Sequence, residues 1–167
     1  MAEIVERARM TAAHEGPVAV FVIGMRINNV FRMTRWWPAF RAMLTMLREL
    51  SADPDSGYLG GEAMFRSWRI PVLIQYWRSF DDLHAYAHAA ERHHQPAWRA
   101  FNKAGGRDGT VGIFHETYIV EPGRYESVYA NMTPFGLGAA GGGTRPATGR
   151  RKEAKGRLST GGKAAAV

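Results

Sequence analysis

The chain has 167 residues, enough for one domain with a hydrophobic core and too few for two. Its composition, 46% hydrophobic and 22% charged, is ordinary for a globular protein, and the absence of cysteine excludes disulfides, thiolate metal sites and cysteine nucleophiles. The net charge of +7 suggests a nucleic-acid-binding protein, but residues 139–167 contain seven basic side chains and one acidic one, so the remainder is nearly neutral.

Residues 1–16 are expected to form an approach segment that leads into the domain. They begin with MAEIVERARM, in which acidic residues precede any apolar run, and this is not typical of a signal peptide. No apolar stretch reaches the roughly 18 residues that a transmembrane helix requires. We therefore expect a cytoplasmic protein with no membrane span.

Regular elements are predicted from residue 17 onward. Residues 17–28 form a β-branched run with apolar residues on both faces, which indicates a strand covered on both sides. A helix is predicted from Thr34 to the turn signal SADPDSG, with one apolar stripe at spacings of three and four. Residues 58–66 and 69–77 are predicted to be two strands joined by a tight turn near Ser67 and Trp68.

The second half of the predicted domain repeats the helix-then-strand order. Ser79 is the expected N-cap of a second helix, with Asp82 in the capping-box position, and this helix runs toward His93. A fourth long strand is predicted at 110–120, followed by a short fifth strand in YESVYANM, residues 125–132. The order β-α-β-β-α-β predicts an α+β, ferredoxin-like domain over residues 17–138, with an antiparallel sheet and two main helices on one face.

The face of this sheet that the helices leave free is also predicted to be apolar. Along residues 18–23, Val18, Val20 and Val22 alternate with Ala19, Phe21 and Ile23, so both faces carry apolar side chains. A second copy of the chain would cover the free face, which predicts a homodimer. The covered sheet is also a natural site for a small-molecule pocket.

Residues 139–167 differ in composition from the predicted domain. They are rich in Gly, Ala, Thr and basic residues and have no apolar periodicity, so we expect a disordered tail. A solvated tail that aids solubility is the favoured interpretation. Contact of the tail with nucleic acid or an anionic surface is the alternative, but it is not expected to be the main function.

Histidines are the most informative ionisable residues. His84 and His88 are four residues apart on the second helix, a spacing that can bind zinc, but no further ligand accompanies them and a solvated helix face is favoured. His93 and His94 lie where this helix is expected to break, before Pro96. They are interpreted either as capping the helix end or as an axial ligand that reaches into an apolar pocket.

The pair His115–Glu116 lies in the middle of the fourth strand. Alternation places His115 on one face with Ile113 and Ile119, whereas Glu116 takes the opposite face. A histidine among apolar neighbours is often a satisfied core residue, and this interpretation stays open. The other interpretation is that His115 is buried for use as a general acid or base.

Four blocks of the sequence together resemble the DUF4188, or monooxygenase af470-like, family of the dimeric α/β-barrel superfamily over about residues 10–138. They are GMRINNVFRMTRWWPAF, LIQYWRSFDDLHAYA, HQPAWRAFN and GIFHETYIVEPGRYESVYANMTPFGLG. The C-terminal half is more weakly similar to haem-containing aldoxime dehydratases. That resemblance implies that His94 corresponds to a haem ligand, His115 to a catalytic histidine, and NMTPFGLG to the closing segment.

These expectations combine into one functional hypothesis. The chain is predicted to be a homodimeric, monooxygenase-like enzyme that acts on a small, largely apolar organic substrate, with haem b as cofactor, His94 as iron ligand and His115 as acid or base. Glu116 is expected to be structural. The alternatives are a cofactor-independent monooxygenase of the antibiotic-biosynthesis type, an aldoxime-dehydratase-like lyase, and a non-catalytic module that binds haem or another ligand.

Overall fold

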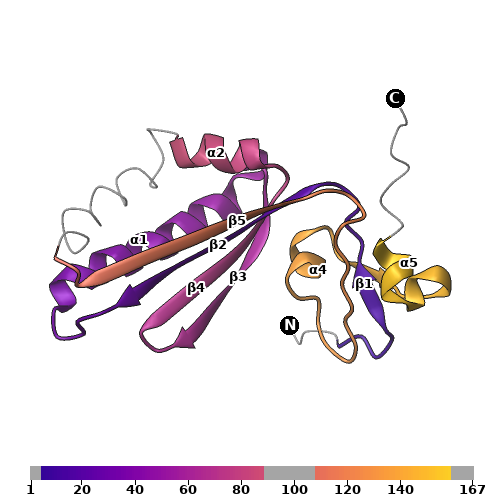
Figure 1. Cartoon of the computed structure of the whole chain (residues 1–167), viewed down its shortest axis with the longest axis horizontal. Helices are drawn as coiled ribbons and strands as arrows, with labels where there is room; N and C mark the ends of the chain where they lie inside the picture. The colour runs from indigo at the N-terminus through magenta and orange to yellow at the C-terminus, as the bar shows by residue number, and fades with distance from the viewer. Residues whose placement is uncertain (1–4, 89–107, 159–167) are drawn as a thin grey trace.

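A computed structural model describes residues 5–88 and 108–158 and shows the ferredoxin-like arrangement that the sequence predicts (Figure 1). The domain is α+β, with an antiparallel sheet in the strand order β3-β4-β2-β5. The helices α1 and α2 lie on the same side of this sheet. The elements are β2 (Val18–Ile27), α1 (Met33–Ala52), η1 (Pro54–Ser56), β3 (Tyr58–Ser67), β4 (Ile70–Trp77), α2 (Phe80–His88) and β5 (Val111–Val120).

Strand register sorts the side chains of the sheet into rows that run across it. Phe21 of β2 pairs with Gln75 of β4 on one side and with Thr117 of β5 on the other. The adjacent row on the same face, two residues further along β2, contains Leu73, Ile23 and His115. Because side chains alternate between faces, odd-numbered residues of these three strands face the helices and even-numbered residues face away.

The start of α2 is fixed by local interactions that the sequence predicts. Ser79 is the N-cap, because its Oγ accepts a hydrogen bond from the Asp82 backbone N–H at 3.0 Å. Arg78 forms a salt bridge with Asp82 at 2.9 Å, and hydrogen bonding by Arg78 holds the pKa of Asp82 below its usual value. Gly57 packs against this carboxylate so closely that a Cβ would lie 2.4 Å from Asp82 Cγ, and its φ is +78°.

A small C-terminal lobe packs beside the sheet and corrects two predictions. The lobe contains β1 (Met10–Ala12), α4 (Leu137–Ala140), β6 (Thr144–Pro146), η3 (Gly149–Lys152) and α5 (Ala154–Leu158). β1 pairs antiparallel with β6, so residues 10–12 are not merely an approach segment. The predicted disorder is wrong for residues 139–158, whereas residues 159–167 lie outside the described residues. Pairing between distant parts of the chain orders this lobe, and composition cannot reveal such pairing.

The predicted fifth strand at 125–132 is not a regular strand. Tyr129 forms an isolated bridge with Met10, and Met132 forms one with Glu6. Met10, Val18, Tyr129 and Leu137 pack into a hydrophobic cluster that joins the lobe to the end of the sheet. This segment therefore connects the two parts instead of extending the sheet.

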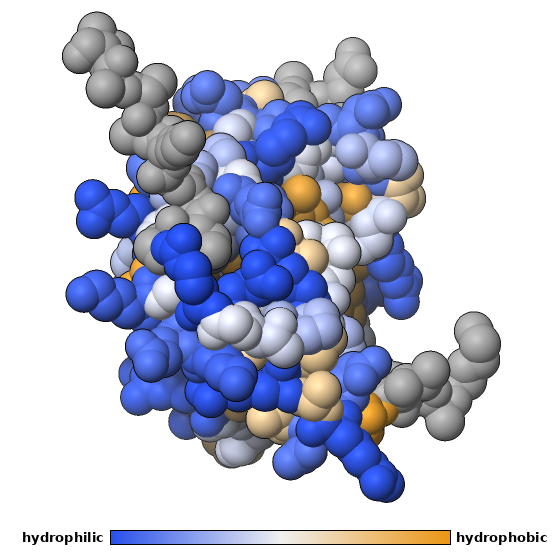
Figure 2. All heavy atoms as spheres, turned by 90° about the vertical axis from the view of Figure 1, so that its right-hand side faces the viewer, coloured by the Kyte–Doolittle hydropathy of each residue, from blue (hydrophilic) through white to orange (hydrophobic). Residues whose placement is uncertain are grey.

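Solvent faces most of the lobe's outer surface. Figure 2 shows this end of the molecule as largely hydrophilic, with small and scattered hydrophobic patches. The basic residues of the segment 139–158 thus lie on a folded lobe. Over residues 5–88 and 108–158, none of the helices combines the length and hydropathy that crossing a bilayer would require.

Candidate functional site

A cavity of about 450 Å³ lies between the helix-facing side of the sheet and the helices α1 and α2. Its volume is within the range of small-molecule sites. The walls are mainly aliphatic, aromatic and thioether side chains. They come from the strands (Phe21, Ile23, Gly24, Met25, Leu73, Gln75, Ile113, His115 and Thr117), from α1 (Ala39, Ala42, Met43, Met46 and Leu50) and from α2 (Phe80, Leu83, His84, Tyr86, Ala87 and His88).

His115 lies on the sheet wall of this cavity. It shares the helix-facing side with Ile113 and Thr117, as the alternation predicts. Its ring centroid is 5.7 Å from that of Phe21. The expectation that His115 is buried is wrong for this single chain, because the side chain is exposed where it borders the cavity. Alternation of apolar residues defines the face of a strand but not how much of that face is covered.

Glu116 is not part of this site. Its carboxylate lies on the opposite face of the sheet, where it accepts a hydrogen bond from the Tyr118 hydroxyl and raises the pKa of that hydroxyl. His115 and Glu116 are therefore not a buried ionisable pair. The two side chains lie on opposite faces of one strand, and the hydrogen bond to Tyr118 agrees with a structural role for Glu116.

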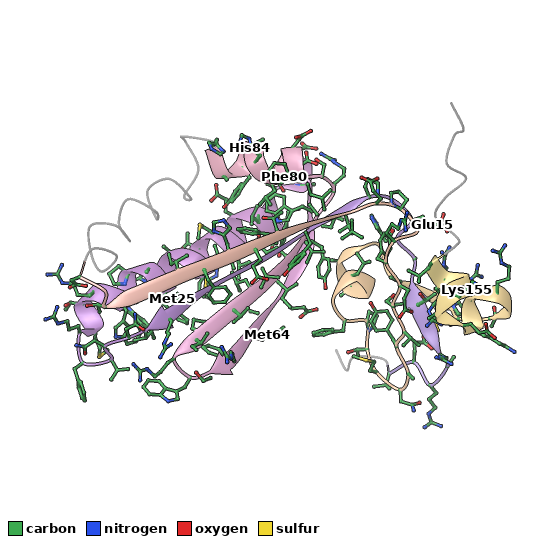
Figure 3. The ribbon with its side chains drawn as sticks, viewed as in Figure 1. Glu15, Met25, Met64, Phe80, His84 and Lys155 are labelled. Atoms are coloured by element: carbon green, nitrogen blue, oxygen red, sulfur yellow. The ribbon has the colours of Figure 1, made fainter. Side chains whose placement is uncertain are left out.

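The α2 histidines, for which the sequence favours a solvated helix face, are exposed as expected and also lie at the edge of the cavity. The rings of His84 and His88 stack with centroids 4.0 Å apart, and Phe80 lies one turn before His84 (Figure 3). His88 Nδ1 is 2.8 Å from the His84 carbonyl oxygen. A carbonyl only accepts, so Nδ1 carries the hydrogen and Nε2 is the acceptor of a neutral His88. Leu83 and Ala87, at helical spacing, mark the side of α2 that faces the sheet, and the two histidines lie next to it.

Gln75 is the polar wall residue that the sequence interpretation missed. It is 7% exposed on an otherwise apolar strand face, and its Oε1 accepts a hydrogen bond from Trp77 Nε1 at 3.1 Å. A single polar residue within the alternating segment IPVLIQYW was the available signal. Burial of an amide is costly unless its hydrogen bonds are satisfied, so this residue requires an explanation.

The iron ligand predicted at His94 lies outside the described residues. Within residues 5–88 and 108–158, no group of three or more His, Asp or Glu side chains is arranged to hold a metal ion. The three wall histidines thus do not form a metal cluster. They present imidazoles around an apolar space, a setting in which proton transfer to or from a bound molecule is chemically feasible.

A second, small cavity belongs to the C-terminal lobe. Its volume is about 30 Å³, close to the share of liquid that one water molecule occupies. The side chains of Arg145, Arg151 and Arg157 line it together with Tyr125 and Glu126. It is too small for an organic ligand, and the polar walls suit one bridging water.

The structure is a ferredoxin-like α+β domain with a largely apolar cavity between its sheet and its helices. The chain belongs to the Monooxygenase af470-like family, whose model matches residues 18–137. A relative, Monooxygenase af470 from Aspergillus fumigatus, is 32% identical over 136 residues, which cover 74% of this chain and 46% of the relative. The chain thus spans less than half the length of that relative.

Solved structures also resemble the chain. An aldoxime dehydratase in complex with butyraldoxime matches 80% of this chain and 40% of its own, with 14% identity and a TM-score of 0.60. This likeness supports the fold. A putative antibiotic biosynthesis monooxygenase from Caulobacter crescentus matches 62% of this chain and 91% of its own, with 13% identity and a TM-score of 0.44.

Proposed function

We propose that this protein is a monooxygenase-like oxidoreductase that acts on a small, largely apolar organic substrate. The observation that carries the proposal is the apolar cavity of about 450 Å³ with His115 on its sheet wall, in a chain of the Monooxygenase af470-like family. Such walls bind an apolar molecule by removing its surface from water. The proposed localisation is cytoplasmic.

The proposed roles divide between the walls and the imidazole. Side chains of α1 such as Met43 and Met46 give an adaptable apolar surface, because thioethers fill irregular gaps. The Phe21 ring lies beside the His115 ring, with centroids 5.7 Å apart. His115 then acts as acid or base toward the atom of the substrate that lies nearest the fourth strand of the sheet, β5.

Haem b is the proposed cofactor. The described lining is largely apolar, as the ring of haem requires, and the proposed iron ligand is His94. When bound, haem supplies the activation of oxygen, while the protein binds and orients the substrate. The walls contain no Lys or Arg among the residues that the structure describes, so partners for the haem carboxylates are not part of this lining.

The described lining without Lys or Arg favours a second candidate, a cofactor-independent monooxygenase. In that case His115 removes a proton from an activated carbon of the substrate, and the resulting carbanion reacts with oxygen.

Haemin titration distinguishes the haem-dependent proposal from the cofactor-independent one. If haem is the cofactor, the wild type develops a sharp Soret band that His94→Ala loses, whereas His84→Ala and His88→Ala keep it. Absence of binding by the wild type contradicts the haem proposal and favours the cofactor-independent one.

Oxygen consumption tests the function itself. The purified protein, with and without haemin and a reductant, is tested against a panel of small apolar compounds. His115→Leu should fold normally, because the side chain is exposed, and should lower turnover by roughly 100-fold or more. His14→Leu is the control, since His14 is not among the residues that line the apolar cavity and is hydrogen-bonded to the Pro17 carbonyl. Equal turnover by His115→Leu and the wild type would remove His115 from the mechanism.

We also propose that the protein is a homodimer. The sheet face opposite the helices carries Val22, Ile74 and Phe114, and Phe114 is 39% exposed there. Met64 of β3 lies in the same row as Phe114. A second copy of the chain packed on this face would bury these side chains around a two-fold axis.

A further inference from the structure

Gln75 presents a fixed hydrogen-bond donor to the cavity. The residue is 7% exposed and lies in the row of Phe21 and Thr117. Its amide has two ends, and the neighbouring indole decides which end is used by the protein. An indole N–H can only donate, so the group 3.1 Å from Trp77 Nε1 must be the carbonyl oxygen of Gln75.

Trp77 is itself held in place, which makes the amide orientation rigid. It is 0% exposed, and its ring contacts those of Tyr58 and Tyr86 with centroids 5.4 and 5.6 Å away. Leu50 and Leu83 complete the surrounding cluster. Rotation of the indole would disrupt this packing, and a flip of the Gln75 amide would place two donors against each other.

The other end of the amide is an NH₂ group with two hydrogens. Among residues 5–88 and 108–158, the indole of Trp77 is the hydrogen-bond partner of the Gln75 side chain. Gln75 is one of the cavity-lining residues. A largely buried donor that the protein leaves to a cavity is matched by a ligand or by water, because an unmatched donor is costly.

We infer that Gln75 is a specificity-determining residue that selects substrates carrying a hydrogen-bond acceptor, and that the substrate is a largely apolar, neutral carbonyl compound. This inference rests on the proposed function, because it names the substrate class of the same cavity. A carboxylate would require a cation beside it, which the Gln75 amide does not provide. A neutral carbonyl needs only the donor that Gln75 provides.

The sheet register relates this anchor to the proposed acid–base group. Gln75 and His115 lie on strands separated by β2 and in adjacent rows of the same face. Two strand spacings and one two-residue step place their Cα atoms about 12 Å apart. A substrate whose carbonyl binds Gln75 would extend across Phe21 and place its far end near His115, so Gln75 selects and positions whereas His115 reacts.

Matched probes test the inference without knowledge of the substrate. The pair is 1-tetralone and tetralin, which differ by a carbonyl in place of a methylene. Calorimetric titration gives the affinity of each for the wild type and for Gln75→Met. We expect the tetralone affinity, relative to that of tetralin, to fall about tenfold or more in Gln75→Met. Leu73→Met, in the next row of the same strand, is the control and should change both affinities alike.

Infrared spectra give a second readout that does not depend on affinity. The carbonyl stretch of bound 1-tetralone should lie at lower wavenumber in the wild type than in Gln75→Met, because the amide donates to it. Trp77→Phe keeps a ring in the cluster but removes the N–H that orients the amide, so the wavenumber of the bound carbonyl should rise above that in the wild type. This variant decides the question even where Gln75→Met fails to fold.

The outcomes separate this inference from the proposed function. An unchanged affinity ratio and an unchanged carbonyl stretch in the variants would overturn the role of Gln75, while substrate-dependent oxygen consumption would still support the oxygenase. Failure of the wild type to bind either probe would overturn the inference and would also remove the cavity as the substrate site. Loss of oxygen consumption with the affinity ratio intact would leave a carbonyl-binding module without oxygenase activity.

Discussion

Arg157 Nε donates a hydrogen bond to Glu126 Oε2 at 2.6 Å, which fastens α5 to the segment that follows β5. The Arg157 side chain is 5% exposed, and its Nη1 also donates to the carbonyl oxygens of Arg151 and Lys152. One guanidinium therefore ties together three parts of the lobe. Hydrogen bonds donated by a charged guanidinium are stronger than those between neutral groups.

This relationship predicts that the C-terminal segment contributes to stability. Arg157→Met should lower the free energy of unfolding by about 1–3 kcal/mol, because it leaves the two backbone carbonyls and Glu126 without their partner. Lys155→Met on the same helix is the control, since Lys155 is exposed, and it should change stability little. Urea unfolding of both variants measures the difference. Equal stability of Arg157→Met and the wild type would show that the lobe is not held by this residue.

The interactions at the start of α2 predict a pH dependence. The Arg78 hydrogen bond lowers the pKa of Asp82 in the folded state, so this interaction stabilises the fold above the ordinary carboxyl pKa of about 4 and is lost as the pH falls through the lowered value. Asp82→Asn should therefore destabilise the protein at neutral pH, and only modestly, because the Arg78 side chain is 60% exposed and solvent screens the pair. The difference from the wild type should shrink on acidification.

Asp81→Asn is the matched control for this measurement. Both carboxylates lie in the first turn of α2 and interact with the helix dipole in the same way, but Asp82 carries the salt bridge to Arg78. Thermal unfolding of the two variants from neutral to acidic pH separates the two effects. A pH dependence that is the same for Asp81→Asn and Asp82→Asn would assign the effect to the dipole alone.

Local signals in the sequence were enough to predict the domain. The β-branched run of β2, the apolar stripe of α1 and the N-cap Ser79 each act over a few residues, and the structure confirms all three. The strand order β3-β4-β2-β5 follows from the order of these elements along the chain. The ordered lobe did not follow, because β1 and β6 pair across more than a hundred residues and neither is long enough to give a pattern.

The candidate site was predictable only in part, for the same reason. Strand alternation correctly separated His115 from Glu116, but exposure of His115 depends on what the helices cover. The place of His84 at the cavity edge depends on how α2 packs on the sheet, and the orientation of the Gln75 amide depends on contacts around Trp77. Packing between elements creates these features, and it is not encoded at a fixed spacing.

Filling the cavity should separate ligand binding from stability. Ala42 lies on α1 and lines the cavity, so Ala42→Phe adds a ring to space that the proposed substrate occupies. Affinity for tetralin should fall by at least tenfold, whereas the melting temperature should stay the same or rise, because the new ring gains apolar contacts. Thr45→Phe adds the same ring to the exposed side of α1 and is the control. Unchanged tetralin affinity in Ala42→Phe would place the ligand elsewhere.

The outer face of the sheet gives the last prediction, which concerns assembly. Phe114 packs closely against Gly24 of the neighbouring strand, since a Cβ at position 24 would be 2.6 Å from the Phe114 ring. The ring is 39% exposed and Tyr118, two residues along the same face, is 52% exposed. Phe114, Val22 and Ile74 form an apolar strip on this face, bordered by Glu116 and its partner Tyr118, and a second copy of the chain would cover the strip. We expect the wild type to sediment as a dimer at micromolar concentration.

Phe114→Glu should convert this dimer to a monomer, because it places a charge within the apolar part of the proposed interface. The circular dichroism spectrum should stay unchanged, since the ring lies outside the three core clusters. Phe31→Glu is the control: Phe31 is 94% exposed in the loop before α1, and its replacement should leave the dimer intact. Sedimentation velocity distinguishes the two variants. A wild type that sediments as a monomer, or a Phe114→Glu variant that stays dimeric, would contradict assembly through this face.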